Sequence, residues 1–213
     1  YLNSGDMIEA HEYKSQFGQD IFVLWQSKFK KNGFFVEFGA TDGVEKSNSY
    51  ILEKEFGWSG ILAEPAKVWH KSLRKNRNVI IDDRCVWSES KKKLEFKETD
   101  LHELSTIQEY SAIDMHSELR VSGNTYQVET ISLNDLLMQH DAPKKIDYLS
   151  IDTEGSEFEI LQDFDFSKFE IRIITVEHNF TEMREKIFEL LTVHGYKRVF
   201  VELSNVDDWY IKD

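Results

Sequence analysis

Short apolar runs alternate along this chain with amphipathic stretches, which is the pattern of an α/β protein. The runs that predict buried strands are Phe34–Phe38, Ile61–Ala63, Asn78–Ile81, Ile146–Ile151 and Ile171–Val176. The stretches between them carry apolar residues at helical spacing, and helices of about 10 to 15 residues between strands are typical of βαβ units. We therefore expect a mainly parallel sheet with right-handed crossovers and helices on both faces.

The two ends of the chain predict elements that flank this sheet. A first helix is predicted from five apolar residues at helical spacing, namely Phe17, Ile21, Leu24, Trp25 and Phe29. Ser15 is its expected cap and Gly33 its stop, so one face should pack against the sheet. At the other end, the ranges 196–203 and 209–211 predict two strands joined by a polar turn, which suits a final antiparallel pair.

One long polar stretch interrupts the pattern. The third strand, which starts at Asn78, is expected to end within 82–87, and a strand is predicted over 94–97 and again over 126–132. Between the last two, residues 99–126 contain no proline and show no sustained period. We interpret them as an insertion over the site, either a mobile lid or an ordinary surface excursion. The rest reads as one domain over 1–213, with an N-terminal helical segment at about 1–32.

Composition narrows the class of protein. A chain of 213 residues can bury one good core, and 40% hydrophobic against 31% charged residues is globular rather than disordered. No apolar run is long enough to span a membrane. The formal charge of −13 disfavours binding to a polyanion, so we expect no nucleic-acid partner. The sequence does not reveal the oligomeric state.

Cysteine usage bears on the compartment. Cys85 is the one cysteine, which excludes an intrachain disulfide and fits a reducing environment. No signal peptide is visible, so a cytoplasmic location is expected. Because the chain begins at Tyr1 rather than at a methionine, upstream sequence can be missing.

The first strand ends in a loop suited to a cationic ligand. Glu37 lies near the strand's carboxyl end, and Gly39 and Gly43 bracket Asp42 in the loop that follows. Dinucleotide sites use G-x-G-x-x-G, and the missing third glycine disfavours a pyrophosphate. Carboxylates accept charge-assisted hydrogen bonds from an ammonium group and bonds from hydroxyls, both of which S-adenosylmethionine offers. The plain alternative is a glycine-rich turn in any α/β protein.

Two later segments extend this interpretation. Glu64 follows the second strand, roughly 20 residues beyond the glycine loop, where a strand-end acid binds ribose hydroxyls. Residues 83–85 can supply a polar and apolar wall for an adenine ring. Glu64 can equally be a surface acid before Pro65.

Strand-end residues later in the chain predict the chemical half of a site. His178 is the preferred general base, because an imidazole titrates near neutrality and this one follows a predicted strand. A hydrogen-bonded structural histidine is the alternative. Asp152, Glu154 and Glu177 gather carboxylates at adjacent strand ends, where they can hold a divalent cation such as Mg²⁺ or bind substrate hydroxyls. The sequence leaves the metal open.

Several segments together resemble the FkbM family of S-adenosylmethionine-dependent methyltransferases. They are Ser15–Asp20, Val36–Gly43 with Ser47 and Asn48, Ala63–Pro65 and Ile151–Leu161, and the last is similar to the family's I-D-x-E-G-x-E pattern. The resemblance covers the chain from about residue 15 onward, except 99–126. It implies a Rossmann-like class I methyltransferase fold, with a seven-stranded, mainly parallel sheet whose last strand is antiparallel. It also implies transfer of a methyl group to a hydroxyl oxygen of a sugar, glycan or small natural product.

The resemblance also implies which residues form the site. Those expected to contact S-adenosylmethionine are Gln19, Glu37, Gly39, Ala40, Asp42, Gly43, Ser47, Asn48, Glu64, Pro65, Asp83, Arg84, Cys85 and Asp152. Catalysis is expected from His178, Asp152 and Glu177. Two rival functions stay open: a nicotinamide-dependent oxidoreductase on a similar sheet, and a methyltransferase-like module that binds a glycan or protein without turnover.

Overall fold

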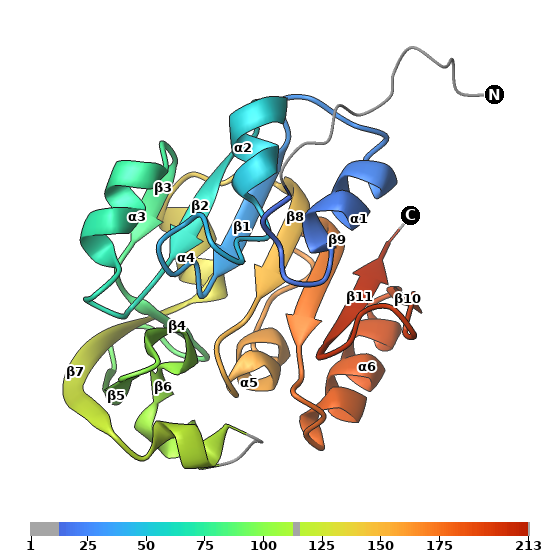
Figure 1. Cartoon of the computed structure of the whole chain (residues 1–213). Coiled ribbons are helices and arrows are strands. Elements are labelled where there is room, and N and C mark those ends of the chain that lie inside the picture. The colour runs from blue at the N-terminus through green and yellow to red at the C-terminus, as the bar shows by residue number, and fades with distance from the viewer. Residues whose placement is uncertain (1–12, 113–115, 213) are drawn as a thin grey trace.

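A seven-stranded mixed sheet forms the centre of the protein, in a computed structural model that describes residues 13–112 and 116–212 (Figure 1). In spatial order its strands are β3 (Ile80–Asp82), β2 (Ser59–Ala63), β1 (Phe34–Phe38), β8 (Lys145–Ile151), β9 (Glu170–Glu177), β11 (Asp207–Ile211) and β10 (Lys197–Val199). The first five are parallel to one another, whereas β11 is antiparallel to both β9 and β10. The chain is therefore an α/β fold.

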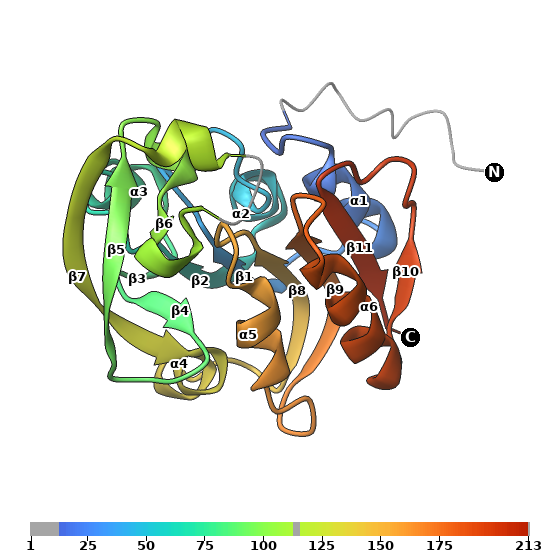
Figure 2. The same cartoon turned by 90° about the horizontal axis from the view of Figure 1, so that it is seen from below.

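Helices cover both faces of this sheet (Figure 2). On one face lie α1 (Gln19–Gln26), α2 (Tyr50–Phe56) and α3 (His70–Asn76), and on the other α4 (Leu133–Gln139), α5 (Glu157–Gln162) and α6 (Met183–Val193). Neighbouring strand residues serve opposite layers, since Phe35 packs with α1–α3 and Val36 with α4–α6. Burial on both faces explains why these strands are continuous apolar runs.

A second sheet lies beyond the carboxyl ends of β1 and β2 (Figure 1). Its order is β4 (Cys85–Trp87), β7 (Gly123–Ser132), β5 (Lys93–Thr99) and β6 (Thr106–Ile107). The predicted single strand from Asn78 into 82–87 is thus wrong, because β3 pairs with β2 whereas β4 pairs with β7. In the described part of the segment between β5 and β7 lie three short 3₁₀ helices, His102–Leu104, Gln108–Tyr110 and Ser117–Arg120.

The first helix differs from its prediction in length and in buried face. It begins after Gly18, which has a left-handed conformation, and ends before Lys28 and Phe29, both with φ of 55°. Its buried face carries Gln19 and Asp20 with three apolar residues, whereas Ile21 and Trp25 are exposed. Gly18 rather than Ser15 occupies the N-cap position, and Ser15 Oγ donates to the Asp20 carboxylate at 2.5 Å and accepts from the first-turn Asp20 amide at 3.4 Å. The prediction assumed that only apolar residues face the core, and the burial of Gln19 and Asp20 made that assumption wrong.

The two strands at the end of the chain differ from their predicted bounds: the first ends earlier, and the second begins earlier. The strand predicted over 196–203 ends at Val199, because Phe200 takes a φ of 54° and its carbonyl accepts from the Leu203 amide in a turn. Its partner begins at Asp207, two residues before the predicted start. The two strands pair antiparallel. None of the helices in the described part of the chain is both long and apolar enough to cross a membrane.

Candidate active site

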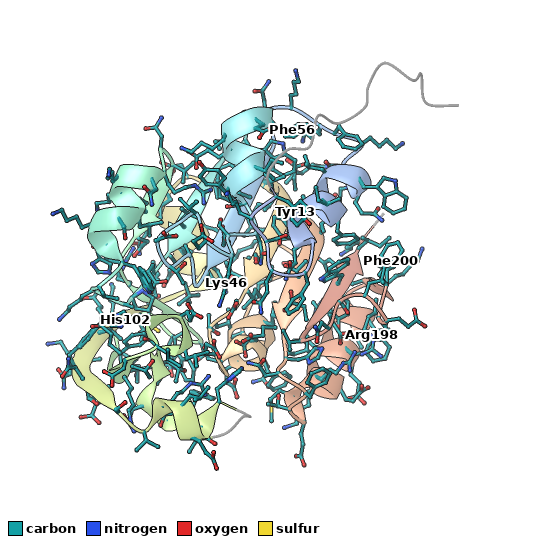
Figure 3. The ribbon with its side chains drawn as sticks, viewed as in Figure 1. Tyr13, Lys46, Phe56, His102, Arg198 and Phe200 are labelled. Carbon is teal, nitrogen blue, oxygen red and sulfur yellow. The ribbon has the colours of Figure 1, made fainter. Side chains whose placement is uncertain are left out.

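A cavity of about 370 Å³ is lined by residues at the carboxyl ends of β1, β2, β8 and β9 and by residues of the second sheet. The chain leaves the middle of the main sheet in opposite directions from β1 and β8, and doubly wound sheets bind ligands at such a switch point. We call the described residues 101–112 and 116–120 the cap, since many of them line the side opposite the strands. Lys46 on the strand side and His102 on the cap side are labelled in Figure 3.

Gly39 brings β1 and β8 together at the cavity. Its φ is +71°, and a Cβ atom built there would lie 2.1 Å from the backbone oxygen of Asp152. Its amide donates to the Ala63 carbonyl at 3.1 Å, which ties it to β2 as well. The site therefore needs glycine here both for backbone conformation and for close approach of two strands.

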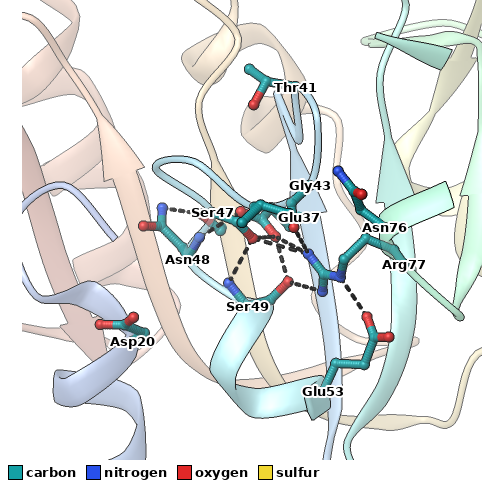
Figure 4. A network of polar contacts seen from close by, with 12 residues as sticks. Asp20, Glu37, Thr41, Gly43, Ser47, Asn48, Ser49, Glu53, Asn76 and Arg77 are labelled. Carbon is teal, nitrogen blue, oxygen red and sulfur yellow. Dashed lines mark hydrogen bonds and ion pairs between the residues drawn. The ribbon is translucent and has the colours of Figure 1, made fainter. Parts of the chain in front are cut away.

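Glu37 does not line the cavity; its carboxylate holds the loop after β1 in place (Figure 4). It accepts hydrogen bonds from the Asn48 amide at 2.7 Å, from Ser47 Oγ at 3.1 Å and from Ser49 Oγ. The expectation that Glu37 meets the ligand directly thus has no support in the geometry. Its carboxylate is instead hydrogen-bonded to residues of the loop.

Four further loop residues also lie outside the cavity lining. Asp42 accepts from the amides of Val44 and Glu45 at 2.8 and 3.0 Å and so closes a turn. The others pack inside the protein, where Ala40 joins the apolar core, Gly43 abuts Arg77 and Ser47 hydrogen-bonds Arg77.

Two amide side chains predicted to bind the cofactor do line the cavity. Gln19 donates to the Asp207 carboxylate at 2.6 Å, and Asn48 donates to Ser150 Oγ at 2.9 Å. The Asn48 Oδ1 atom is buried and has no hydrogen-bond partner among residues 13–112 and 116–212. A buried acceptor without a partner costs free energy, so it is suited to a ligand donor such as an ammonium group.

Glu64 extends from the end of β2 into the cavity, next to Pro65. Its two oxygens accept from the amides of Thr41 and Ala66, both at 2.8 Å. Burial raises the pKa of Glu64 to about 7, although these two hydrogen bonds favour the charged form. The carboxylate is thus held rigidly at the position where strand-end acids bind ribose.

Of the three residues predicted to contact adenine, Cys85 lines the cavity and the other two do not. Asp83 is an exposed partner of Arg74 at 2.6 Å, and Arg84 binds the Asp82 carboxylate. Burial raises the pKa of the Cys85 thiol to about 12, so it is a neutral, apolar part of the wall. Cys85 reaches the cavity because it begins β4, which belongs to the second sheet and does not continue β3.

Three carboxylates meet at the ends of β8 and β9, as the sequence predicted. Each of Asp152, Glu154 and Glu177 has an oxygen atom within 4.8 Å of the other two, and all three line the cavity. Burial, followed by the charges of Asp207 and Glu157, raises the pKa of Asp152 to about 8. Burial and the nearby Asp152 carboxylate raise the pKa of Glu177 well above its ordinary value. Two carboxylates this close together favour protonation of one of them.

Glu154 differs from the other two because it is paired with the cap. Arg120 Nη2 lies 2.5 Å from a Glu154 oxygen, and Asn179 Nδ2 lies 3.4 Å from the same atom. Arg120 also donates to the Leu104 carbonyl, and Thr106 Oγ1 donates to the Glu154 carbonyl at 2.9 Å. At the opposite rim Lys46 pairs with Glu103 at 2.6 Å. The cap is thus attached to both halves of the cavity.

His178, the predicted general base, faces away from the cavity. Glu177 and Asn179 line the cavity, and His178 between them does not. Its Nδ1 accepts from the Phe180 amide at 3.0 Å, and its Nε2 lies 3.8 Å from Asp208. Burial lowers the pKa of this imidazole. Nδ1 is therefore hydrogen-bonded within its own turn, and Nε2 is buried without a hydrogen-bond partner among the described residues, so the geometry does not support His178 as the general base.

Sequence reasoning missed several residues that line the cavity. His102 and His116 come from the cap, and Asp207 comes from the start of β11. His102 Nδ1 lies 2.7 Å from the Thr99 carbonyl, which favours the tautomer with a free lone pair on Nε2. The cap has no periodicity that predicts its path, so the sequence offered no signal for its histidines. Burial raises the pKa of Asp207 to about 7.

The buried acids predict a pH-dependent stability of the ligand-free protein. Glu64, Asp152 and Asp207 have pKa values raised to about 7, 8 and 7, so the folded state binds more protons than the unfolded state in this range. The stability they contribute is complete below their ordinary values and is lost as pH rises through 7 to 8. We expect the melting temperature to fall between pH 6 and pH 9. Calorimetric scans across that range check this, and a constant or rising melting temperature would contradict it.

Residues 37–198 match the family model described as "Methyltransferase FkbM domain". The match spans well over half of the chain. The chain belongs to this methyltransferase family. The matched range starts at Glu37 and includes Gly39, Glu64, the Asp152–Glu154 turn and Glu177. Gln19 and Asp207, which hydrogen-bond each other at the cavity, lie outside it.

Two of the solved structures that resemble this chain carry the names of methyltransferases. Precorrin-6y C5,15-methyltransferase from Geobacter metallireducens GS-15 is 12% identical with a TM-score of 0.48, covering 90% of this chain and 86% of its own. A protein described as a sarcosine dimethylglycine methyltransferase from Galdieria sulphuraria is 10% identical with a TM-score of 0.40, covering 85% and 62%. No curated protein sequence matches significantly. The family membership rests on the sequence match.

Proposed function

We propose that this FkbM-family domain is an S-adenosylmethionine-dependent O-methyltransferase acting on a hydroxyl of a sugar, glycan or small natural product. The observation that carries the proposal is the Glu64 carboxylate, held in the cavity at the end of β2 by two backbone amides. The strand order, with β11 antiparallel to its neighbours, supports a Rossmann-like class I methyltransferase arrangement. The oxygen-directed chemistry and the acceptor class come from the family resemblance.

The charge of the cavity supports a cationic cofactor. Six carboxylates line it: Glu64, Glu103, Asp152, Glu154, Glu177 and Asp207. The one Lys or Arg among the described lining residues is Lys46, already paired with Glu103. Burial raises the pKa of Glu64, Asp152, Glu177 and Asp207, and a nearby cation such as the ammonium or sulfonium of S-adenosylmethionine would favour their ionised form. The pyrophosphate of a nicotinamide dinucleotide would instead meet these acids and, among the described lining residues, no Lys or Arg besides the paired Lys46. The oxidoreductase alternative is disfavoured on this ground.

The contacts that would hold the cofactor follow from the same lining. Glu64 is proposed to accept from the ribose hydroxyls, and Asn48 Oδ1, buried without a partner in the described chain, to accept from the amino group. Cys85 and Val86 form an apolar wall suited to adenine. When bound, S-adenosylmethionine supplies an electrophilic methyl group on its sulfonium.

The Asp152–Glu177 pair is the proposed base for the acceptor hydroxyl. Methyl transfer needs the acceptor oxygen aligned with the methyl group, and a hydroxyl attacks better as it loses its proton. In this proposal the proton passes to a carboxylate oxygen of the pair, whose raised pKa makes it a stronger base than an ordinary carboxylate.

A divalent cation on Asp152, Glu154 and Glu177 is the alternative route to an activated hydroxyl. The three oxygens are close enough to share one ion. Glu154 is, however, already paired with the Arg120 guanidinium, which a cation would have to displace or tolerate. We therefore favour the base, and turnover that survives chelation and does not respond to added Mg²⁺ would support that choice.

A thermal-shift and calorimetry panel tests the proposed function. S-adenosylmethionine and S-adenosylhomocysteine should each raise the melting temperature, and NAD⁺ should not. Stabilisation by NAD⁺ alone would favour the oxidoreductase, and no response to either sulfur compound would reject the proposal. Binding without methyl transfer to any acceptor in a broad hydroxyl panel would favour the non-catalytic module.

Glu64→Gln should weaken S-adenosylhomocysteine binding by roughly 1–3 kcal/mol, because a charged acceptor for the ribose is lost. The titration belongs at pH 8, where more of Glu64 is ionised, since its pKa is about 7. Glu170→Gln is the control: Glu170 pairs with Lys145 at 3.3 Å and does not line the cavity. Equal affinities for Glu64→Gln and the unaltered protein would remove Glu64 from the site.

A further inference from the structure

Arg77 is a fully buried cation beneath the loop that follows β1 (Figure 4). Arg77 directly follows the last residue of α3. All three of its guanidinium nitrogens donate hydrogen bonds. Nη1 donates to the Gly43 carbonyl and to Ser47 Oγ, both at 3.0 Å, and Nη2 donates to Ser49 Oγ at 2.8 Å. Nε donates to Glu53 at 2.5 Å. One side chain thus binds the loop at its start and its end.

Glu37 binds the same loop from the strand. It accepts from the Asn48 amide and from the hydroxyls of Ser47 and Ser49, and its nearer oxygen lies 3.9 Å from Arg77 Nη1. The two serine hydroxyls therefore lie between a buried carboxylate and a buried guanidinium. Since each charge is costly to bury alone, the loop is stabilised only when both partners are in place.

The loop carries groups that reach the cavity, although Arg77 itself does not. The Thr41 amide donates a hydrogen bond to Glu64, and Lys46 forms an ion pair with Glu103 of the cap. Asn48 also lines the cavity, and its Oδ1 atom has no hydrogen-bond partner among the described residues. Resting on the proposed function, we propose that Arg77 is a positioning residue for cofactor binding, which with Glu37 orders the loop before the cofactor arrives. Ordering in advance removes an entropy cost from binding.

The geometry requires arginine rather than any cation. The planar guanidinium meets four acceptors in different directions, whereas a lysine ammonium offers three donors from a single nitrogen. Arg77→Lys keeps the charge that compensates Glu37 and Glu53 but loses most of these bonds. It therefore tests position separately from charge.

The experiment combines hydrogen exchange of the loop amides with calorimetry, using S-adenosylhomocysteine as the probe. In Arg77→Lys, amides of residues 41–49 should exchange faster without ligand. The dissociation constant should rise about 10- to 100-fold, because cofactor binding would then have to order several loop residues. The KM for S-adenosylmethionine should rise while kcat at saturation changes little, a split that loss of overall stability alone would not produce.

Matched variants make the outcome decisive. Arg184→Lys is the control, because Arg184 binds Asp208 at 2.8 and 3.0 Å away from the cavity, so it should lower stability without changing affinity. If Arg77→Lys does not fold, Ser49→Ala removes a hydroxyl shared by Arg77 and Glu37 and should shift exchange and affinity in the same direction. Exchange or affinity equal to the unaltered protein in the folded variant would overturn this inference alone. Absence of binding by the unaltered protein would overturn the proposed function as well.

Discussion

Asp152→Asn is expected to lower turnover by about 10²- to 10⁴-fold while the protein stays folded, because the replacement removes half of the proposed base and no volume. Asp152 is half-buried beside Glu177, and loss of solvent around its carboxylate raises its pKa to about 8. The neutral amide relieves charge repulsion, so this variant should be at least as stable as the unaltered protein above pH 8. A loss of turnover cannot then be attributed to unfolding.

The measurement is S-adenosylhomocysteine formation with an acceptor that the unaltered protein methylates. Turnover of the unaltered protein should rise with pH as the Asp152–Glu177 pair ionises, and Asp152→Asn should lose that dependence. His178→Ala in the same assay separates the two assignments of the base. Undiminished turnover in Asp152→Asn would remove Asp152 from the proposed base, and an equally large loss in His178→Ala would return the role to the histidine.

Gly39→Ala should destabilise the protein by about 3 kcal/mol or more and abolish measurable cofactor binding. The added Cβ would lie 2.1 Å from the Asp152 carbonyl oxygen at a φ of +71°, so β1 and β8 would have to separate at the cavity. The atom that the new Cβ would meet belongs to the backbone after β8, which cannot move aside in the way that the end of a flexible side chain can.

Gly18→Ala is the matched control for that substitution. Gly18 also has a positive φ, of +85°, but a Cβ there would meet nothing within 4 Å. Its cost is the left-handed conformation alone, about 1–2 kcal/mol. Chemical denaturation of both variants checks the difference, and equal losses of stability would show that crowding against Asp152 has no effect.

Much of the main sheet was predictable because its strands are buried on both faces. Residues such as Phe35 and Val36 serve opposite core layers, so the run stays apolar and is recognised without knowing its neighbours. The second sheet was not predictable in this way. The Cys85–Trp87 strand pairs with residues about 45 positions later, and no local pattern encodes such a partner.

The candidate site divides along the same line. That Asp152, Glu154 and Glu177 would meet follows from strands of one parallel sheet ending at one edge, and the three do meet. Whether a polar side chain points into the cavity can differ between two neighbouring residues, and the sequence does not show which of the two does so. Glu177, the last residue of β9, lines the cavity, whereas His178, the first residue after the strand, does not.

The sequence by itself determined the fold class, the family and the strand-end acids, because periodicity and short motifs are local properties of the chain. Only the tertiary structure decided that Glu37 pairs with the loop rather than the cavity, since that depends on Arg77 arriving from α3. It likewise decided that the cap supplies His102 and His116. These outcomes depend on contacts between distant segments, and side-chain direction at such contacts is set by packing rather than by local sequence.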